Sequence, residues 1–284
     1  MNAYIEIIRP GNVVMAMIAI ILVAIVGSVY NIPMILSAIA VLFVISAGNV
    51  INDVFDYKID LINRPDRPIP SGRISLKNGR IYAYLLFISA IVCGAIISFM
   101  VKNLIPVGIV IFAVIALYAY AAWLKTTLLL GNFLVAFMTC LCFIFGGYCA
   151  GLSINNQQII YVSAFLGFFA LLATLGREIT KDIEDMEGDI SQGAKTFPIM
   201  YGTKKSAIIA ASLIIIACIL SPMLYFAHIF NNYYLVIVAI SVIVFLYGSI
   251  SLLKDQSPEN CHKVSKTLKI AMIIAFIAFA IGSF

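Results

Sequence analysis

Residues 48–73 read GNVINDVFDYKIDLINRPDRPIPSGR and follow directly on a long apolar run. At about 100° per residue on a helix, Asp53, Asp56 and Asp60 fall within about 60° of one another, and Asn49 lies in the same sector. Three carboxylates on one face repel each other, so this spacing predicts a bound cation. Carboxylate and amide oxygens are hard ligands, which favour Mg²⁺ or Ca²⁺ over zinc.

The composition around this stretch is that of a membrane protein. The chain has 284 residues, of which 63% are hydrophobic and 11% charged, and its mean hydropathy is +1.08. Apolar windows of about 20 residues predict nine membrane-spanning helices. Their expected ranges are about 11–30, 34–55, 82–101, 104–123, 128–151, 159–176, 206–227, 233–253 and 268–284. The predicted fold is therefore an all-α polytopic membrane protein, whose helices we expect to surround a central cavity.

The charged residues predict the topology. With the N-terminus in the cytoplasm, every Lys and Arg except Lys102 lies on the cytoplasmic side, as the positive-inside rule requires. All 13 Asp and Glu residues lie there too. The C-terminus is then outside. The net charge of +5 does not indicate nucleic-acid binding, because acids are interleaved with the bases, and phosphate or anionic lipids fit better as partners.

Cysteine and histidine do not predict a site. The six cysteines lie almost entirely within apolar runs and form no CxxC pair, which indicates packing residues. His228 and His262 fall in loops on opposite sides of the membrane. A histidine-based metal site or catalytic triad is therefore not expected.

A second acidic stretch, GREITKDIEDMEGD at residues 176–189, ends the sixth predicted helix. On a helical projection, its acids Glu178, Asp182, Asp185 and Asp189 fall within about 60°. Each of these two acidic faces, which we call acidic stripes, lies at the end of an even-numbered predicted helix. Asp56 and Asp185 stand 129 residues apart. This placement suggests one domain over residues 1–284, built of two related four-helix units (about 1–123 and 124–253) and a ninth helix.

Basic residues flank both stripes. Three prolines within six positions stiffen the loop that carries Arg64, Arg67 and Arg73, which predicts a rigid cap. A positive-inside anchor loop is the alternative. Arg9 and Lys125 stand alone at helix ends, where they are either interfacial anchors or phosphate ligands.

Two functions could require acidic stripes near the membrane boundary, where a charge costs about 2.5 kcal/mol or more. A cation-coupled transporter is one, although its acids usually stand singly at the membrane midplane. The other is Mg²⁺-dependent handling of a lipid diphosphate, for which an allylic prenyl diphosphate is the natural substrate. Loss of its diphosphate leaves a resonance-stabilised cation, and metal ions stabilise the leaving group. The position at helix ends favours this second function.

The two patterns, Asn52-Asp53-x-x-Asp56-x-x-x-Asp60 with the following proline-rich segment and Asp182-x-x-Asp185-x-x-x-Asp189, resemble the aspartate-rich motifs of the UbiA superfamily of intramembrane prenyltransferases. The nine-helix count resembles that superfamily too. Within it, the two segments are most similar to those of archaeal digeranylgeranylglyceryl phosphate synthases. This resemblance implies transfer of a geranylgeranyl group from its diphosphate to geranylgeranylglyceryl phosphate, which forms the second ether bond of an archaeal membrane lipid.

The resemblance also implies roles for individual residues. The metal ligands, for two Mg²⁺ ions, are Asn52, Asp56, Asp60, Asp185 and Asp189, with Asp53 and Asp182 in support. Catalysis is assigned to Asp56, Asp60, Asp185, Asp189 and Lys125. Substrate binding is assigned to Asn52, Arg64, Arg67, Tyr120 and Lys181, with Arg9 and Arg73 as candidates for the acceptor phosphate. The expected location is the cell membrane, with the active site toward the cytoplasm and no obligate protein partner. An aromatic acceptor, as for quinone or haem precursors, is the nearest alternative.

Overall fold

The computed structural model describes residues 2–191 and 193–284. Over this part of the chain the regular structure is entirely helical, and nine helices are long and apolar enough to cross a membrane. They are α2 (Pro10–Gly27), α3 (Ile32–Phe55), α5 (Leu76–Val101), α6 (Ile105–Ala122), α7 (Leu130–Ser153), α8 (Gln157–Glu184), α11 (Thr203–Leu220) continued by α12 (Met223–Phe226), α13 (Asn232–Lys254) and α14 (Pro258–Gly282). The predicted all-α membrane fold is confirmed, whereas the central cavity and the orientation of the termini stay predictions.

Five short helical elements lie between or before these spans. They are α1 (Ala3–Ile7), α4 (Tyr57–Asn63), η1 (Leu124–Thr126), α9 (Met186–Ser191) and α10 (Phe197–Tyr201). Two of them, α4 and α9, each follow a long helix after a single turn residue, Asp56 or Asp185. Each acidic motif therefore coincides with a place where a membrane helix gives way to a short α-helix after one turn residue.

Several spans are longer than hydropathy predicts. The third begins at Leu76 rather than about residue 82, the sixth continues to Glu184 rather than 176, and the ninth begins at Pro258 rather than 268. Hydropathy detects only the apolar part of a helix, whereas the backbone continues through polar turns until a cap ends it. Ser75 and Ser257 supply such caps, since their side chains accept hydrogen bonds from the backbone N–H of Asn78 and Asn260.

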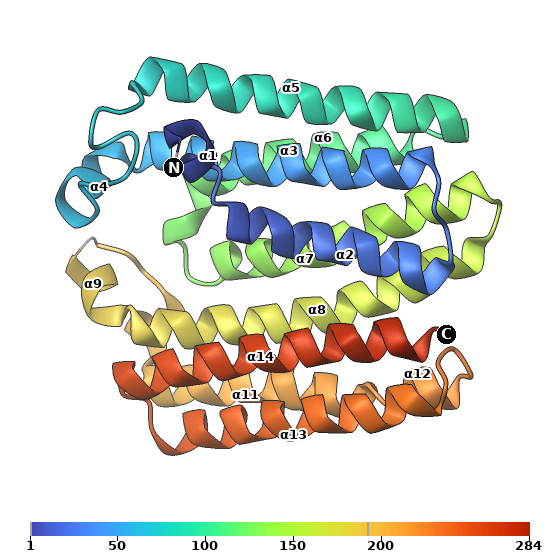
Figure 1. The fold of residues 1–284 in the computed structure, drawn as a ribbon. Helices are drawn as coiled ribbons and strands as arrows, with labels where there is room; N and C mark the ends of the chain where they lie inside the picture. Colours follow the sequence, from blue (N-terminus) through green and yellow to red (C-terminus); the bar gives the residue numbers. More distant parts are fainter. Residues whose placement is uncertain (1, 192) are drawn as a thin grey trace. The chain divides into compact units, whose positions relative to one another are not determined.

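The chain divides into two compact units. The first comprises residues 1–124 and 141–163, and in it α3 packs against α2, α5 and α6 (Figure 1). Its buried cluster includes Ile7, Val50, Ile51 and Ile74, so the N-terminal segment belongs to this core. Glycine permits close helix contact here, because a Cβ on Gly147 would stand 2.6 Å from the Cβ of Ser163.

The second unit comprises residues 125–140 and 164–284. In it α13 packs against α11 and α14, around a buried cluster that includes Ile179, Ile183, Ile214 and Leu268 (Figure 1). That cluster reaches the end of α8, where the second acidic stretch lies. The kinship of two four-helix units, predicted from the sequence, stays a prediction.

Candidate active site

The first aspartate motif, residues 52–60, keeps a helical path across the break between α3 and α4. The Asp56 N–H donates to the Asn52 carbonyl at 2.9 Å, and the Asp60 N–H donates to the Asp56 carbonyl at 2.8 Å. The Arg64 N–H continues the series by donating to the Asp60 carbonyl at 2.9 Å. The four-residue spacing therefore still places these side chains on neighbouring turns, as the helical projection assumes.

Asn52 and Asp56 form a pair within this motif. The Asn52 Nδ2 donates to Asp56 Oδ2 at 2.8 Å. The Asn52 Oδ1 atom is buried and has no hydrogen-bond partner among the described residues. A buried amide oxygen without a partner is uncommon in proteins and calls for an explanation, such as an ion or a ligand.

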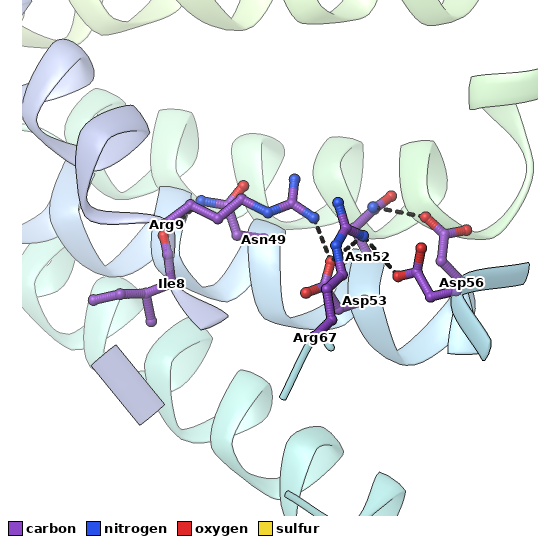
Figure 2. A network of polar contacts seen from close by, with 8 residues as sticks. Ile8, Arg9, Asn49, Asn52, Asp53, Asp56 and Arg67 are labelled. Atoms are coloured by element: carbon purple, nitrogen blue, oxygen red, sulfur yellow. Dashed lines mark hydrogen bonds and ion pairs between the residues drawn. The ribbon is translucent and has the colours of Figure 1, made fainter. Parts of the chain in front are cut away.

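Asn49 and Asp53 contact the N-terminal segment instead. The Asn49 Nδ2 donates to the Ile8 carbonyl at 2.7 Å, and the guanidinium of Arg9 forms an ion pair with Asp53 (Figure 2). Asp53 is almost completely buried, with 3% of its side chain exposed. The predicted acidic face is thus divided between two sets of partners.

Arg67 returns from the proline-rich loop to the same motif. Its Nη1 donates to Asp60 Oδ2 at 2.6 Å and lies 3.3 Å from Asp53 Oδ1. The loop is held in shape by internal hydrogen bonds, among them Ser71 N–H to the Arg67 carbonyl at 3.0 Å and Ile74 N–H to the Pro68 carbonyl at 2.9 Å. An ordered loop of this kind is what the proline content predicts.

The other two arginines of this loop differ from Arg67. Arg73 forms a bidentate pair with Glu6, at 2.6 and 2.8 Å, and its Nε donates to Ser71. Hydrogen bonding to Arg73 lowers the pKa of the Glu6 carboxyl, and Glu6 raises the pKa of Arg73. The Arg64 side chain is exposed and makes no hydrogen bond or ion pair within the described residues.

The second aspartate motif, residues 182–189, repeats the backbone arrangement of the first. The Asp185 N–H donates to the Lys181 carbonyl at 2.8 Å, and the Asp189 N–H donates to the Asp185 carbonyl at 3.0 Å. Asp185 occupies the turn between α8 and α9, as Asp56 does between α3 and α4. A shift of 129 residues thus relates the two motifs in structure as well as in sequence.

The side chains of the second motif have other partners. Asn132 Nδ2 donates to Asp182 Oδ2 at 2.7 Å, while Arg177 and Lys181 pair with Glu178. Burial raises the pKa of the Asp189 carboxyl above its ordinary value, and the charge of Asp185 raises it further. In this motif an amide therefore orients Asp182, whereas Arg177 and Lys181 pair with the preceding acid Glu178.

Two residues near the second motif were not predicted from the sequence. Asn132, near the start of α7, contacts Asp182 from 50 positions away. His262 Nδ1 of α14 lies 2.6 Å from Glu184 Oε1, at the end of α8. The only sequence signal for Asn132 is a polar residue near the start of an apolar helix, which does not identify its partner.

Tyr120 and Lys125 lie at the end of α6 and in η1, and both are half-buried. They belong to different compact units, Tyr120 to the first and Lys125 to the second. Their predicted contact with the diphosphate stays a prediction.

The donor atoms of both motifs suit a hard divalent cation. Within residues 2–191 and 193–284, no three His, Cys, Asp or Glu side chains come together as a metal-binding group. Mg²⁺ does not require such a group, because proteins commonly bind it through one or two carboxylates and the phosphates of the substrate. In the first motif, the Asp56 carboxylate and the unpaired Asn52 Oδ1 supply oxygens of the required kind.

Comparison with known proteins identifies the protein family to which the chain belongs. The UbiA prenyltransferase family model matches residues 12–279, so the chain belongs to that family. It is a multi-pass membrane enzyme, an intramembrane prenyltransferase. The most similar relatives include the digeranylgeranylglyceryl phosphate synthase of Methanobrevibacter smithii, 63% identical over 100% of this chain and 99% of the relative. The enzyme of the same name from Methanosphaera stadtmanae is 47% identical over 100% of both chains.

Solved structures agree with this fold. A structure described as digeranylgeranylglyceryl phosphate synthase is 38% identical and superposes with a TM-score of 0.84, over 99% of this chain and 97% of that one. A UbiA homolog from Archaeoglobus fulgidus bound to GPP and Mg²⁺ is 14% identical, with a TM-score of 0.64 over 98% and 99% of the two chains. At that identity the second structure supports the fold alone.

Proposed function

We propose that this protein transfers a geranylgeranyl group from geranylgeranyl diphosphate to the free hydroxyl of geranylgeranylglyceryl phosphate, in a reaction that depends on Mg²⁺. The observation that carries the proposal is the pair of aspartate motifs with equivalent backbone structure. The full-length similarity to two enzymes named digeranylgeranylglyceryl phosphate synthase supports the choice of donor and acceptor.

The metal ligands in this proposal come from both motifs. Asn52, Asp56 and Asp60 would hold one Mg²⁺, and Asp185 and Asp189 a second, with Asp182 in support. The oxygen ligands of both motifs support the choice of Mg²⁺, and the A. fulgidus homolog of the same fold was solved with GPP and that ion. When bound, Mg²⁺ would neutralise the charge that develops on the departing diphosphate.

The chain's own residues account for the remaining steps. Arg67, Lys125 and Lys181 share the negative charge of the diphosphate while the bond between C1 of the prenyl chain and oxygen breaks, and Tyr120 helps to hold that group. The acceptor hydroxyl then bonds to C1, and its proton passes to an aspartate of the second motif or to the diphosphate. Apolar helix surfaces exclude water, which would otherwise capture the allylic cation.

The phosphate of the acceptor needs a cation of its own. Arg9 and Arg73 are the candidates from the sequence, and both already pair with an acid, Asp53 and Glu6 respectively. Arg73 and Glu6 are both partly exposed, with 40% and 32% of their side chains accessible. A phosphate would therefore replace Glu6 on Arg73 at small cost, because exposed ion pairs contribute little to stability, and Arg73 is the better of the two candidates.

The test measures transfer of the prenyl group by the purified full-length protein in lipid vesicles. Radiolabelled geranylgeranyl diphosphate is offered with geranylgeranylglyceryl phosphate, or with an aromatic quinone or haem precursor. We expect labelled diether lipid with the first acceptor only, and none in the presence of EDTA. Transfer to an aromatic acceptor alone would assign the enzyme to the other acceptor class. Metal-dependent uptake of a solute without prenyl turnover would indicate a transporter.

A further inference from the structure

The first aspartate motif and the preceding Asn49 make two separate sets of contacts. Asn49 and Asp53 are four residues apart and contact the N-terminal segment, Asp53 through Arg9. Asn52 and Asp56, also four apart, contact each other. Only the second set includes a buried oxygen without a partner, that of Asn52.

Two guanidinium groups cover Asp53. Arg9 and Arg67 both contact its Oδ1 atom, as Figure 2 shows. The Asp53 side chain is 3% exposed, whereas Arg9 is 32% and Arg67 20% exposed. The carboxylate thus lies inside and the cations lie between it and water. A divalent ion on this carboxylate would stand beside two guanidinium groups, which repel it strongly at short range, whereas Asp60 pairs with Arg67 alone among the described residues.

The backbone at Arg9 indicates that its position is held under strain. Arg9 has φ 54° and ψ 73°, in the left-handed region that non-glycine residues rarely adopt. The contacts that oppose this strain are the hydrogen bond from Asn49 to the Ile8 carbonyl and the ion pair with Asp53. A strained backbone that several contacts hold in place is typical of functional sites.

Asp53 also links three segments of the chain that are far apart in sequence. Arg9 stands 44 residues before it, and Arg67 stands 14 residues after it on the proline-rich loop. Arg67 bonds Asp60 as well, so it joins the two buried acids of the motif. The remaining N–H groups of both arginines stay available to a phosphate, since a guanidinium has five donors.

We propose that Asp53 is a positioning residue and not a metal ligand: it fixes Arg9 and Arg67 so that their outer N–H groups bind the diphosphate of the donor. The inference rests on the proposed function, because it assumes a diphosphate substrate. It separates Asp53 from Asp56, although both belong to the same sequence motif.

The test compares Asp53→Asn with Asp56→Asn in the purified full-length protein. Bound Mn²⁺ is counted by electron paramagnetic resonance at saturating inorganic pyrophosphate, and pyrophosphate affinity is measured by calorimetry at saturating Mn²⁺. Asp53→Asn should keep the wild-type Mn²⁺ count and bind pyrophosphate about ten-fold more weakly, the loss expected when charge-assisted hydrogen bonds are misplaced. Asp56→Asn should bind fewer Mn²⁺ ions. Loss of an ion in Asp53→Asn, or wild-type pyrophosphate affinity, would overturn the proposal.

Arg9→Gln provides a second variant, which leaves the buried carboxylate in place. It should also weaken pyrophosphate binding about ten-fold at full Mn²⁺ count, and the losses in Arg9→Gln and Asp53→Asn should not add in the double variant, because Asp53 acts partly through Arg9. Full additivity, or wild-type affinity in Arg9→Gln, would contradict the proposal even if Asp53→Asn did not fold.

Glu259→Gln is the matched control for charge removal, because Glu259 is an exposed acid that pairs with Lys263 at 2.7 Å. It should behave as wild type in both measurements. A wild-type protein that binds Mn²⁺ and pyrophosphate as expected, but transfers no prenyl group to any acceptor, would refute the proposed function alone. The binding data would then still support the positioning role of Asp53.

Discussion

The two aspartate motifs have the same backbone and different charge partners. In both, a membrane helix ends, an aspartate occupies the turn, and the four-residue hydrogen bonds continue into a short helix. In the first, Arg9 and Arg67 pair with the buried acids Asp53 and Asp60. In the second, the amide of Asn132 contacts Asp182, and the nearby cations pair with Glu178.

This comparison distinguishes the positions of the acids, which the sequence of a motif determines, from their partners, which other segments of the chain supply. The spacing of the acids fixes their place on the helix turns, and it is equal in the two motifs. The basic residues Arg9 and Arg67, which pair with Asp53 and Asp60, come from other segments of the chain. We therefore expect the first motif to bind phosphate through these arginines as well as metal.

Removal of the turn aspartates should have the largest effect. Asp56→Asn and Asp185→Asn should each lower kcat/KM by about 10³-fold, because a metal ligand that stabilises the leaving group contributes several kcal/mol. Initial rates of diether formation measure this. Glu187→Gln, an exposed acid of α9, is the matched control and should stay near the wild-type rate. A wild-type rate in either aspartate variant would remove that motif from the reaction.

Arg67→Gln should come next and should distinguish the two regions. It leaves Asp60 buried without its ion-pair partner, and loss of one member of a buried pair typically costs about 3–5 kcal/mol. The midpoint temperature of its thermal unfolding in detergent should fall clearly, and its KM for the donor should rise. Lys181→Gln should shift unfolding much less, since Arg177 still pairs with Glu178. Equal decreases in unfolding temperature in the two variants would show that the basic residues of the two regions contribute equally to stability.

Asn132→Ala should have a moderate effect confined to the second motif. The variant removes the 2.7 Å hydrogen bond to Asp182, and hydrogen bonds to charged groups contribute about 1.5–3 kcal/mol. We expect about a ten-fold rise in the Mn²⁺ concentration needed for half-maximal rate, as Asp182 loses its orientation. Asn49→Ala removes the amide that donates to the Ile8 carbonyl, just before the first motif, and it should change this metal requirement little.

The pH dependence should be the smallest effect. Burial raises the pKa of Asp189, so the folded protein takes up this proton above the ordinary aspartate pKa of about 3.9. As pH falls toward that value, protonation stabilises the metal-free fold and removes a ligand charge, so Mn²⁺ affinity should decline. Titration of Mn²⁺ affinity against pH checks this, and Asp189→Asn should flatten the curve.

Glu6, whose pKa is lowered, should contribute stability that is lost only below its ordinary pKa.

The sequence could predict the nine helices and the two acidic motifs, because both depend on local periodicity. Hydropathy over about 20 residues identifies a span, and four-residue spacing identifies a face. The ends of α5, α8 and α14 could not be predicted in this way, since their outer turns are polar and depend on caps such as Ser75 and Ser257. The family match over residues 12–279 confirms the resemblance to the UbiA family, whereas the roles assigned to the residues of the motifs stay predictions.

The partners of the acids could not be predicted. The contacts of Arg9 with Asp53 and of Asn132 with Asp182 join residues 44 and 50 positions apart, and no local pattern specifies them. A helical projection placed Asp53 with Asp56 and Asp60 as one acidic face. The structure shows that arginines cover Asp53, which is a property of the tertiary fold.

The central claim is that each motif holds one divalent ion for the same reaction. Its most direct test is the number of Mn²⁺ ions bound per protein at saturating inorganic pyrophosphate, in the wild type, Asp56→Asn and Asp185→Asn. We predict two ions in the wild type and one in each variant. A wild-type count in either variant, or no pyrophosphate-dependent Mn²⁺ binding in the wild type, would contradict the claim.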